Sequence, residues 1–203
     1  MLYEHRGASP SVSENAWVAP TAVLIGDVIV GAGSRVLHGA VLTAEDGQVS
    51  IGKDVVVMEN AVIKGRAGHS VTIGDSVLIG PHAHVNGTSV GRESFIATGA
   101  STFPGSVVEA GCELRINAVL QVNSRLAAGS VVPISWVAVG DPAQLFSPDR
   151  HDDIWAIQKT LNFTGTVYGT ATGVGMDGIM EKQSRFYGTH VADVEIPDGP
   201  TAS

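Results

Sequence analysis

Residues 68 to 87 of the chain read GHSVTIGDSVLIGPHAHVNG, and their spacing decides the fold. Aliphatic side chains recur at Ile73, Ile79 and Val85, in steps of six residues. The same step continues downstream in two further series, at Val90 and Ile96, and then at Val108, Leu114, Leu120 and Leu126. Aliphatic residues every six positions, with Gly, Asn or Asp at the corners, are typical of hexapeptide β-helices, in which short strands stack around a prism. The pattern therefore predicts an all-β solenoid.

A β-sandwich with regular turns is the alternative fold for a chain with many short strands. Sandwich strands recur at about 8 to 12 residues, which is longer than the period of six. A narrow prism also explains the low aromatic content of 5%, because its interior takes branched aliphatic and small residues. Cys112 occupies a small-residue position of the repeat, and we expect it to be buried in the core.

The charge balance of the 203 residues limits the partners. Lys and Arg total 12 against 20 Asp and Glu, a net charge of -8. Such a chain repels nucleic-acid phosphates and anionic lipid heads, so we expect neither as a partner. No window approaches the roughly 20 apolar residues of a membrane-spanning helix. A single cysteine excludes an intrachain disulfide, and the first residues lack the pattern of a secretory signal, which together predict a cytoplasmic protein.

The repeat ends before Ser147, which divides the chain into a β-helix domain at residues 10–145 and a helical extension at residues 146–203. The stretch SPDRHDDIWAIQKTL (147–161) offers Ser147 as N-cap and Pro148 at the first helical position. A loop around GTVYGTATGVG (165–175) is followed by a second predicted helix near MDGIMEKQSRFYG (176–188). We expect both helices to lie on the prism and the last stretch, EIPDGPTAS (195–203), to be a frayed tail.

Four stretches carry a resemblance to a known family: AWVAPTAVLIGDVIVGAGS (16–34), GHSVTIGDSVLIG (68–80), IATGASTFPGSVVEAG (96–111) and VAVGDPAQL (137–145). With them the chain resembles the γ-class carbonic anhydrases and their relatives within the hexapeptide acyltransferase superfamily, over roughly residues 10 to 145. The resemblance implies a left-handed β-helix that assembles as a homotrimer, with active sites between neighbouring subunits. The handedness rests on the resemblance alone, since parallel crossovers are otherwise right-handed.

The zinc ion of a γ-class enzyme is held by three histidines, and the resemblance places these on Lys64, Pro81 and Asn86. The usual Arg and Asp of the preceding coil fall on Thr43 and Glu45. Zinc without imidazole or thiolate ligands at three converging positions is not expected. The resemblance thus implies a diverged relative that has no metal at the family position and lacks zinc-dependent CO2 hydration.

Lys64 places a fixed positive charge where the family keeps its cation. We expect Glu45 and Glu59 to balance this charge, and the three residues are the candidate catalytic groups. Asn86 and Met58, which stands where the family has a substrate-orienting Gln, join Lys64 as candidate substrate-binding residues. The alternative is that Lys64 only forms a structural salt bridge across the trimer interface.

The histidines of GPHAHVNG are interpreted as solvent-facing. His82 and His84 are out of phase with the family's ligand positions, and a one-residue slip in a strand moves a side chain to the other face. A different metal site or a proton-transfer site at this pair stays open as the alternative. His69, beside a glycine, has no companion ligand in the sequence. His38, His151 and His190 are likewise isolated from other potential metal ligands in the sequence.

Three functions follow from these residues. The first is a γ-carbonic-anhydrase-like trimer that binds or converts a small anionic or acyl substrate at the subunit interface. The second is an acyltransferase that uses acyl-CoA and a histidine base, although the sequence shows no projecting loop that carries such a histidine. The third is a non-catalytic trimeric scaffold subunit.

Overall fold

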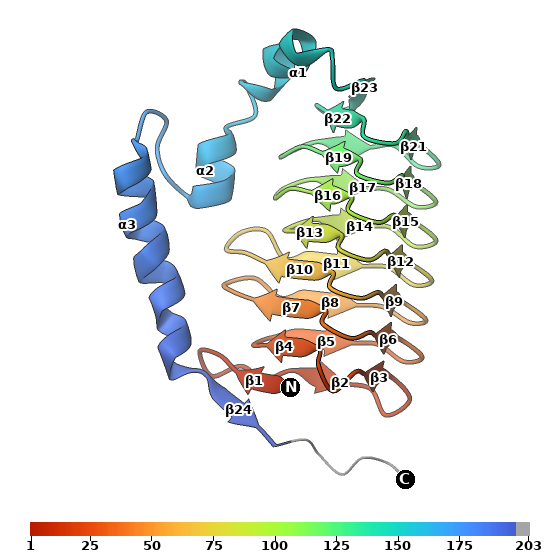
Figure 1. Cartoon of the computed structure of the whole chain (residues 1–203), viewed down its shortest axis with the longest axis vertical. Helices are drawn as coiled ribbons and strands as arrows, with labels where there is room; N and C mark the ends of the chain where they lie inside the picture. Colours follow the sequence, from red (N-terminus) through yellow and green to blue (C-terminus); the bar gives the residue numbers. More distant parts are fainter. Residues whose placement is uncertain (198–203) are drawn as a thin grey trace.

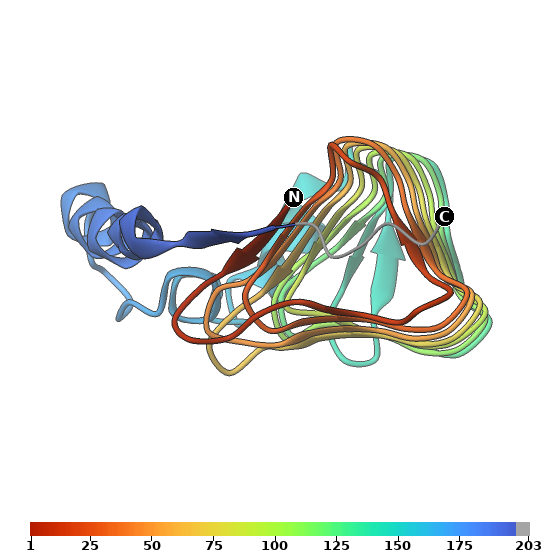
Figure 2. The same cartoon turned by 90° about the horizontal axis from the view of Figure 1, so that it is seen from below.

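The computed structural model describes residues 1–197 and confirms the left-handed parallel β-helix (Figure 1). Strands of two to four residues stack into three sheets that enclose one core. Viewed along its axis, the prism has a triangular outline, and the C-terminal helices lie beyond one of its corners (Figure 2). The six-residue period therefore does correspond to one strand and one corner.

The first sheet contains ten strands. In spatial order they are β23 (Gln144–Phe146), β22 (Val137–Val139), β19 (Val119–Leu120), β16 (Ser101–Thr102), β13 (His84–Asn86), β10 (Val62–Gly65), β7 (Val41–Ala44), β4 (Val23–Ile25), β1 (Leu2–Glu4) and β24 (Val194–Ile196). The two end strands, β23 and β24, pair antiparallel with β22 and β1, whereas the strands between them are parallel. The C-terminal strand thus closes the sheet below the first strand of the chain.

The other two sheets contain seven parallel strands each. The second sheet is β2 (Ser11–Val12), β5 (Val28–Val30), β8 (Val49–Ile51), β11 (Val71–Ile73), β14 (Ser89–Val90), β17 (Val107–Val108) and β20 (Arg125–Leu126). The third sheet is β21 (Val131–Val132), β18 (Glu113–Leu114), β15 (Phe95–Ile96), β12 (Leu78–Ile79), β9 (Val56–Val57), β6 (Arg35–Val36) and β3 (Trp17–Val18).

The core of the prism is built from the aliphatic positions of the repeat. Ile73, Ile79 and Val85 are at most 2% exposed, and they come from three different sheets. Cys112 is fully buried as expected, and burial raises the pKa of its thiol above the ordinary value. Every coil buries its aliphatic residues against the coils above and below, so the core is continuous along the axis.

Glycines that follow aliphatic residues allow close approach between coils. A Cβ atom on Gly31 would lie 2.3 Å from the carbonyl oxygen of Gly52, and one on Gly74 would lie 2.6 Å from the backbone nitrogen of Arg92. These distances are too short for any side chain. The aliphatic-glycine pairs of the sequence therefore mark positions where neighbouring coils touch through their backbones.

The C-terminal segment leaves the end of the prism and returns along its side. It contains α1 (His151–Gln158), α2 (Phe163–Tyr168), α3 (Met176–Tyr187), the 3-10 helix η1 (Gly188–Ala192) and then β24. α1 packs against β22, and α3 runs back beside the coils toward the first strands (Figure 1). We call residues 188–196, which comprise η1 and β24, the strap, because they connect α3 to the first coil.

The helical extension differs from the sequence prediction in three places. Residues 147–150 form a turn, closed by the Arg150 amide donating to the Ser147 carbonyl at 3.0 Å, so α1 begins at His151 with Arg150 in the N-cap position. α2 falls partly within the predicted loop. The predicted tail begins inside β24, where pairing with β1 orders Glu195 and Ile196, and residues 198–203 lie outside the described part of the chain.

Among residues 1–197 no helix has both the length and the apolar character needed to cross a membrane.

Candidate functional site

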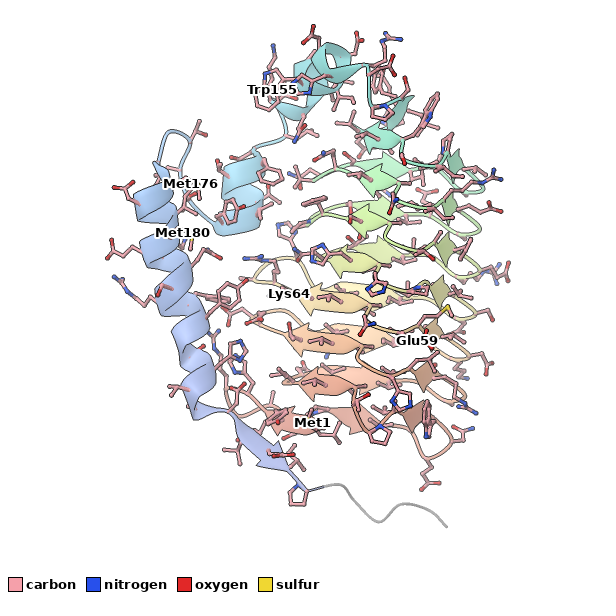
Figure 3. The ribbon with its side chains drawn as sticks, viewed as in Figure 1. Met1, Glu59, Lys64, Trp155, Met176 and Met180 are labelled. Carbon is pink, nitrogen blue, oxygen red and sulfur yellow. The ribbon has the colours of Figure 1, made fainter. Side chains whose placement is uncertain are left out.

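The candidate site begins at a ladder of three outward-facing residues at the ends of neighbouring strands. Lys64 on β10 is in register with Thr43 on β7 and with Asn86 on β13. The ladder occupies the end of the first sheet that faces α3, and Figure 3 shows Lys64 on this side of the prism. The candidate substrate-binding residues Lys64 and Asn86 therefore lie next to each other on adjacent coils.

Glu45 follows β7 and is the central acceptor of the site. Its side chain is only 3% exposed. One carboxylate oxygen, Oε1, lies 3.3 Å from Lys64 Nζ and accepts a hydrogen bond from Thr43 Oγ1 at 3.2 Å. Burial alone would raise the pKa of Glu45, but Lys64 and His190 together lower it below its ordinary value. Glu45 is thus held as a carboxylate inside the protein.

The strap contributes a histidine and a carboxylate to the same place. His190 Nε2 lies 3.0 Å from Glu45 Oε2, and His190 Nδ1 lies 2.7 Å from Asp193 Oδ2. The other oxygen of Asp193 lies 2.5 Å from Nδ1 of His5, which comes from the first coil. The two imidazole rings stack with their centroids 4.4 Å apart. We call His5, Glu45, Lys64, His190 and Asp193 the charged cluster.

The ionisation of the strap residues follows from these contacts. Burial would lower the pKa of His190, but the hydrogen bond to Asp193 and the charge of Glu45 raise it above its ordinary value. Burial would raise the pKa of Asp193, but its bonds to His190 and His5 lower it. The carboxylates of Glu45 and Asp193 therefore both pair with the ring of His190, and Asp193 also pairs with the ring of His5.

Tyr187, the last residue of α3, covers Lys64. Its hydroxyl accepts a hydrogen bond from Lys64 Nζ at 3.2 Å, and the ammonium lies 4.6 Å from the centroid of its ring. Lys64 retains 21% exposure of its side chain. The ammonium is therefore held between a carboxylate and an aromatic ring while one side stays open to solvent.

Asn86 and His84 extend the site along β13. Asn86 is 5% exposed, and its Oδ1 atom is buried without a hydrogen-bond partner among the described residues. His84 is half-buried and packs edge-on against Phe103. Burial, and then the positive charges of Lys64 and Arg66, lower the pKa of His84. A neutral imidazole, an unpartnered amide and a cation therefore line one stretch of surface.

Other predicted site residues lie away from Lys64 in the single chain. Glu59 is exposed at the corner that precedes β10, and Met58 is beside it. This corner is about 15 Å from Lys64 along an extended strand, and Figure 3 shows Glu59 toward the edge of the prism that is away from Lys64 and α3. The His82 amide donates to the Glu59 carbonyl at 3.0 Å, so Pro81 belongs to the same corner one coil later.

The histidines behave differently from the prediction. His82 is exposed at the corner, whereas His84 is half-buried on β13, so the two do not form a solvent-facing pair. His190, which the sequence left isolated, contacts Glu45 and stacks on His5. The prediction failed for His190 because its contact with Glu45 spans 145 residues and no periodic pattern links the two positions.

Four contributors were missed in the sequence: His5, Tyr187, His190 and Asp193. The spacing of His190 and Asp193 by three residues was an available signal for a local pair. Nothing in the sequence connected that pair to the first coil or to Lys64, because the strap carries no repeat.

Comparisons with known proteins agree with this architecture. The chain is 35% identical over 164 residues to gamma carbonic anhydrase 1, mitochondrial, of Arabidopsis thaliana, which covers 77% of this chain and 57% of that protein. It is 34% identical over 158 residues to an uncharacterized protein of Dictyostelium discoideum, covering 75% and 62%. The chain thus spans about three fifths of the length of these two curated relatives. No family model matches the chain.

Two further similarities extend over most of the chain. The carnitine operon protein CaiE of Salmonella agona is 25% identical over 192 residues, covering 92% of this chain and 94% of that protein. Among solved structures, a hexapeptide transferase family protein from Anaplasma phagocytophilum has a TM-score of 0.42 at 22% identity and covers 89% of this chain and 95% of that one.

The side chains at positions 64, 81 and 86 do not fit a zinc ion. The Lys64 ammonium donates to Tyr187 and pairs with Glu45, so it offers no lone pair. Proline has no donor atom in its side chain, and an amide oxygen is a weak ligand for zinc compared with imidazole or thiolate. These three side chains therefore do not form a zinc site.

Proposed function

We propose that this chain, a hexapeptide-repeat β-helix protein similar to the γ-class carbonic anhydrases, forms a homotrimer that binds or converts a small anionic or acyl substrate between subunits. The observation that carries the proposal is the adjacency of Lys64 and Asn86 on neighbouring strands. Lys64 supplies a positive charge with one side open to solvent, and Asn86 supplies an amide whose buried Oδ1 atom lacks a hydrogen-bond partner among the described residues.

The chemistry of this pair suits a carboxylate or the carbonyl of a thioester-bearing acid. A carboxylate accepts hydrogen bonds from the Lys64 ammonium and from the amide NH2 group of Asn86 at the same time, whereas the buried Oδ1 atom of Asn86 requires a donor such as a hydroxyl group or a water molecule. Burial lowers the pKa of His84, and the nearby positive charges of Lys64 and Arg66 lower it further. Two cations therefore lie near this face although the whole chain carries a net charge of -8, and they favour an anion here.

The homotrimer is proposed because the candidate residues occupy two corners of one prism. Met58 and Glu59 lie at the corner before β10, and Lys64 lies at the opposite end of that strand. A second copy packed around the first places its corner at Lys64 and so completes the site with Glu59 as the carboxylate for proton transfer and Met58 as apolar lining. Cyclic symmetry then builds three equal sites.

Apolar ladders on both sides of this corner support the same assembly. On the third sheet, Val56, Leu78 and Phe95 are in register on the outer face, and Phe95 is 40% exposed. On the first sheet, Val41 and Val62 are in register and half-buried. Contiguous exposed apolar surface of this kind is typical of a contact between subunits.

The roles within the site follow from the contacts. Lys64 holds the substrate anion, and Glu45 fixes the position of the ammonium through its ion pair at 3.3 Å. Asn86 donates to or accepts from the second polar atom of the substrate. In this arrangement Glu45 acts on Lys64 rather than on the substrate, and Glu59 of a neighbouring copy is the free carboxylate.

His84 gives the acyltransferase alternative a specific candidate base. Its ring is on the same strand and face as Asn86, and the lowered pKa keeps it neutral near pH 7, as a general base requires. Under this alternative the cofactor is acyl-CoA and the acceptor is deprotonated by His84. The scaffold function predicts that neither acyl-CoA nor a small acid binds.

The test has two parts. Sedimentation at micromolar concentration should give a trimer, and a monomer would overturn the proposal. A thermal-shift screen should then find small carboxylates or acyl-CoAs that raise the melting temperature of the wild type, with no rise for Lys64→Met and an unchanged rise for the control variant His151→Ala, whose side chain is exposed on α1. A ligand that still stabilises Lys64→Met but not His151→Ala would place the site elsewhere. Metal-dependent CO2 hydration supported by positions 64, 81 and 86 should be absent.

A further inference from the structure

We propose that the charged cluster binds a divalent transition-metal ion through His5, Glu45 and His190, because one ligand atom from each of these side chains lies within 4.8 Å of the others. The three residues come from three distant parts of the chain. His5 follows the first strand, Glu45 follows β7, and His190 belongs to the strap. This is a different position from residues 64, 81 and 86.

The outer contacts of the cluster leave one atom of each ligand directed at the site. Glu45 Oε1 is occupied by Lys64 and Thr43, which leaves Oε2 for a metal. The Nδ1 atoms of His5 and His190 are both held by the Asp193 carboxylate, which leaves both Nε2 atoms. Metal-bound histidines in proteins have this arrangement, in which a carboxylate binds the other ring nitrogen and fixes the ring orientation.

His5 Nε2 is the second observation that indicates a ligand. The side chain of His5 is 1% exposed, and this nitrogen is buried without any hydrogen-bond partner among residues 1–197. A buried polar atom without a partner carries a free-energy cost that native structures avoid. A metal ion bound to Nε2 removes that cost, since a neutral imidazole nitrogen is the commonest protein ligand for zinc.

The cluster must contract to hold an ion. Bonds of about 2.1 Å in a tetrahedral site separate ligand atoms by roughly 3.4 Å. The stacked rings of His5 and His190, 4.4 Å apart, must tilt open toward the metal. The strap allows this movement, because His190 retains 27% exposure and is fixed mainly by Glu45 and Asp193. The ion replaces the proton between His190 Nε2 and Glu45 Oε2, and that proton passes to solvent.

The remaining coordination position has space beside it. A cavity of about 180 Å³ is lined by His5 and Glu45 together with Arg6, Asp46 and neighbouring residues. It accommodates a water molecule as the fourth ligand. Two imidazole nitrogens and one carboxylate oxygen suit Zn²⁺ and its first-row neighbours, whereas Mg²⁺ and Ca²⁺ require a shell of oxygen ligands.

The bound ion would act as a structural cross-link, which we call the clamp. It links the first coil, the turn after β7 and the strap, three segments that are otherwise joined by single hydrogen bonds and by the β1–β24 pairing. The clamp does not depend on the proposed function. Loss of carboxylate binding in Lys64→Met would leave it in place.

The experiment uses the full chain without an affinity tag, after removal of metals with a chelator. Addition of Co²⁺ should produce visible d–d absorption that saturates at one equivalent, and Zn²⁺ should displace it. Zn²⁺ should also raise the melting temperature of the wild type by on the order of 5 °C at saturating concentration. Mg²⁺ should do neither.

Variants assign the ligands. His5→Gln and Glu45→Gln should lose the Co²⁺ spectrum, while Asp193→Asn, which weakens only the outer contact, should lower Zn²⁺ affinity by roughly 10- to 100-fold. His151→Gln is the matched control, since His151 is an exposed histidine at the start of α1, at the opposite end of the prism from the first coil. It should bind Co²⁺ as the wild type does.

Two results would overturn the proposal. One is a wild-type protein that shows no saturable Co²⁺ absorption, which requires no variant to fold. The other is an equal loss of Co²⁺ binding in His151→Gln and His5→Gln, which would assign the binding to surface histidines. Circular dichroism of each metal-free variant separates loss of a ligand from loss of the fold.

Discussion

The prism and the strap are held in place by contacts of different kinds. In the prism, each coil repeats the contacts of the coil before it, with aliphatic residues such as Leu24, Leu42 and Ile63 in register and fully buried. In the strap, single polar contacts such as His190 to Glu45 attach a segment that has exposed apolar residues, including Val194 at 61%. The prism is thus stabilised by repeated burial, and the strap by a few specific charges.

The largest expected effect is in the prism. Leu42→Ala removes a fully buried side chain between two coils and leaves a cavity, which should lower the free energy of unfolding by about 2 to 5 kcal/mol. Val194→Ala is the matched aliphatic change in the strap, and it should cost less than about 0.5 kcal/mol because Val194 is exposed. Urea denaturation of both variants measures the difference. Equal losses would show that the strap contributes apolar packing to the fold.

The next largest effect is on the free energy of unfolding when either member of the Lys64–Glu45 ion pair is removed. Glu45→Ala leaves Lys64 and His190 without their shared carboxylate at a site that is 3% exposed, and should cost about 3 to 5 kcal/mol. Lys64→Ala should cost less, about 1.5 to 3 kcal/mol, because Lys64 is partly exposed and Glu45 keeps His190 and Thr43. A larger loss for Lys64→Ala than for Glu45→Ala would contradict this order.

A smaller effect concerns the pH dependence of stability at His84. Burial, followed by Lys64 and Arg66, lowers the pKa of His84 in the folded protein, so the folded state favours the neutral ring. In the unfolded chain the ring takes up a proton near pH 6.5. The stability contributed by the neutral ring is therefore complete above about pH 6.5 and is lost as the pH falls through the lower folded pKa.

His84→Gln tests this pH dependence. Unfolding free energies measured by urea at about pH 7.5 and about pH 5.5 should fall less for His84→Gln than for the wild type. Identical pH slopes for the two proteins would show that His84 titrates freely, as the solvent-facing interpretation of its sequence position predicts.

The smallest effect is expected at His82. Its ring is exposed at a corner, with no side-chain hydrogen bond or ion pair among the described residues and a backbone φ of 57°. His82→Ala should change the free energy of unfolding by no more than about 0.5 kcal/mol. A loss several times larger would mean that the neighbouring copy of the proposed trimer covers His82 and that its ring contributes to the contact at this corner.

The comparison also explains which features could be predicted from the sequence. The coils were predictable because each position of the repeat recurs, so Ile73, Ile79 and Val85 identify three sheets from one short stretch. The adjacency of Lys64 and Asn86 was predictable for the same reason, since both belong to the repeat and are separated by one coil.

The rest of the site was not predictable because it depends on the strap. His190 reaches Glu45 across 145 residues and Asp193 reaches His5 across 188, and each contact occurs once. A contact that occurs once leaves no periodic signal. The start of α1 was misplaced because residues 147–150 form a separate turn, and the local signals of Ser147 and Pro148 suit that turn as well as a helix start.

The most direct test of the charged cluster as a metal centre is anomalous X-ray diffraction at the zinc absorption edge from crystals of the full chain grown with one equivalent of Zn²⁺. We predict one strong peak per chain within bonding distance of Glu45 and of the Nε2 atoms of His5 and His190, with Asp193 bound to the opposite ring nitrogens. A peak beside Lys64 and Asn86 instead, or no peak between His5 and His190, would contradict the assignment of the metal to the junction of prism and strap.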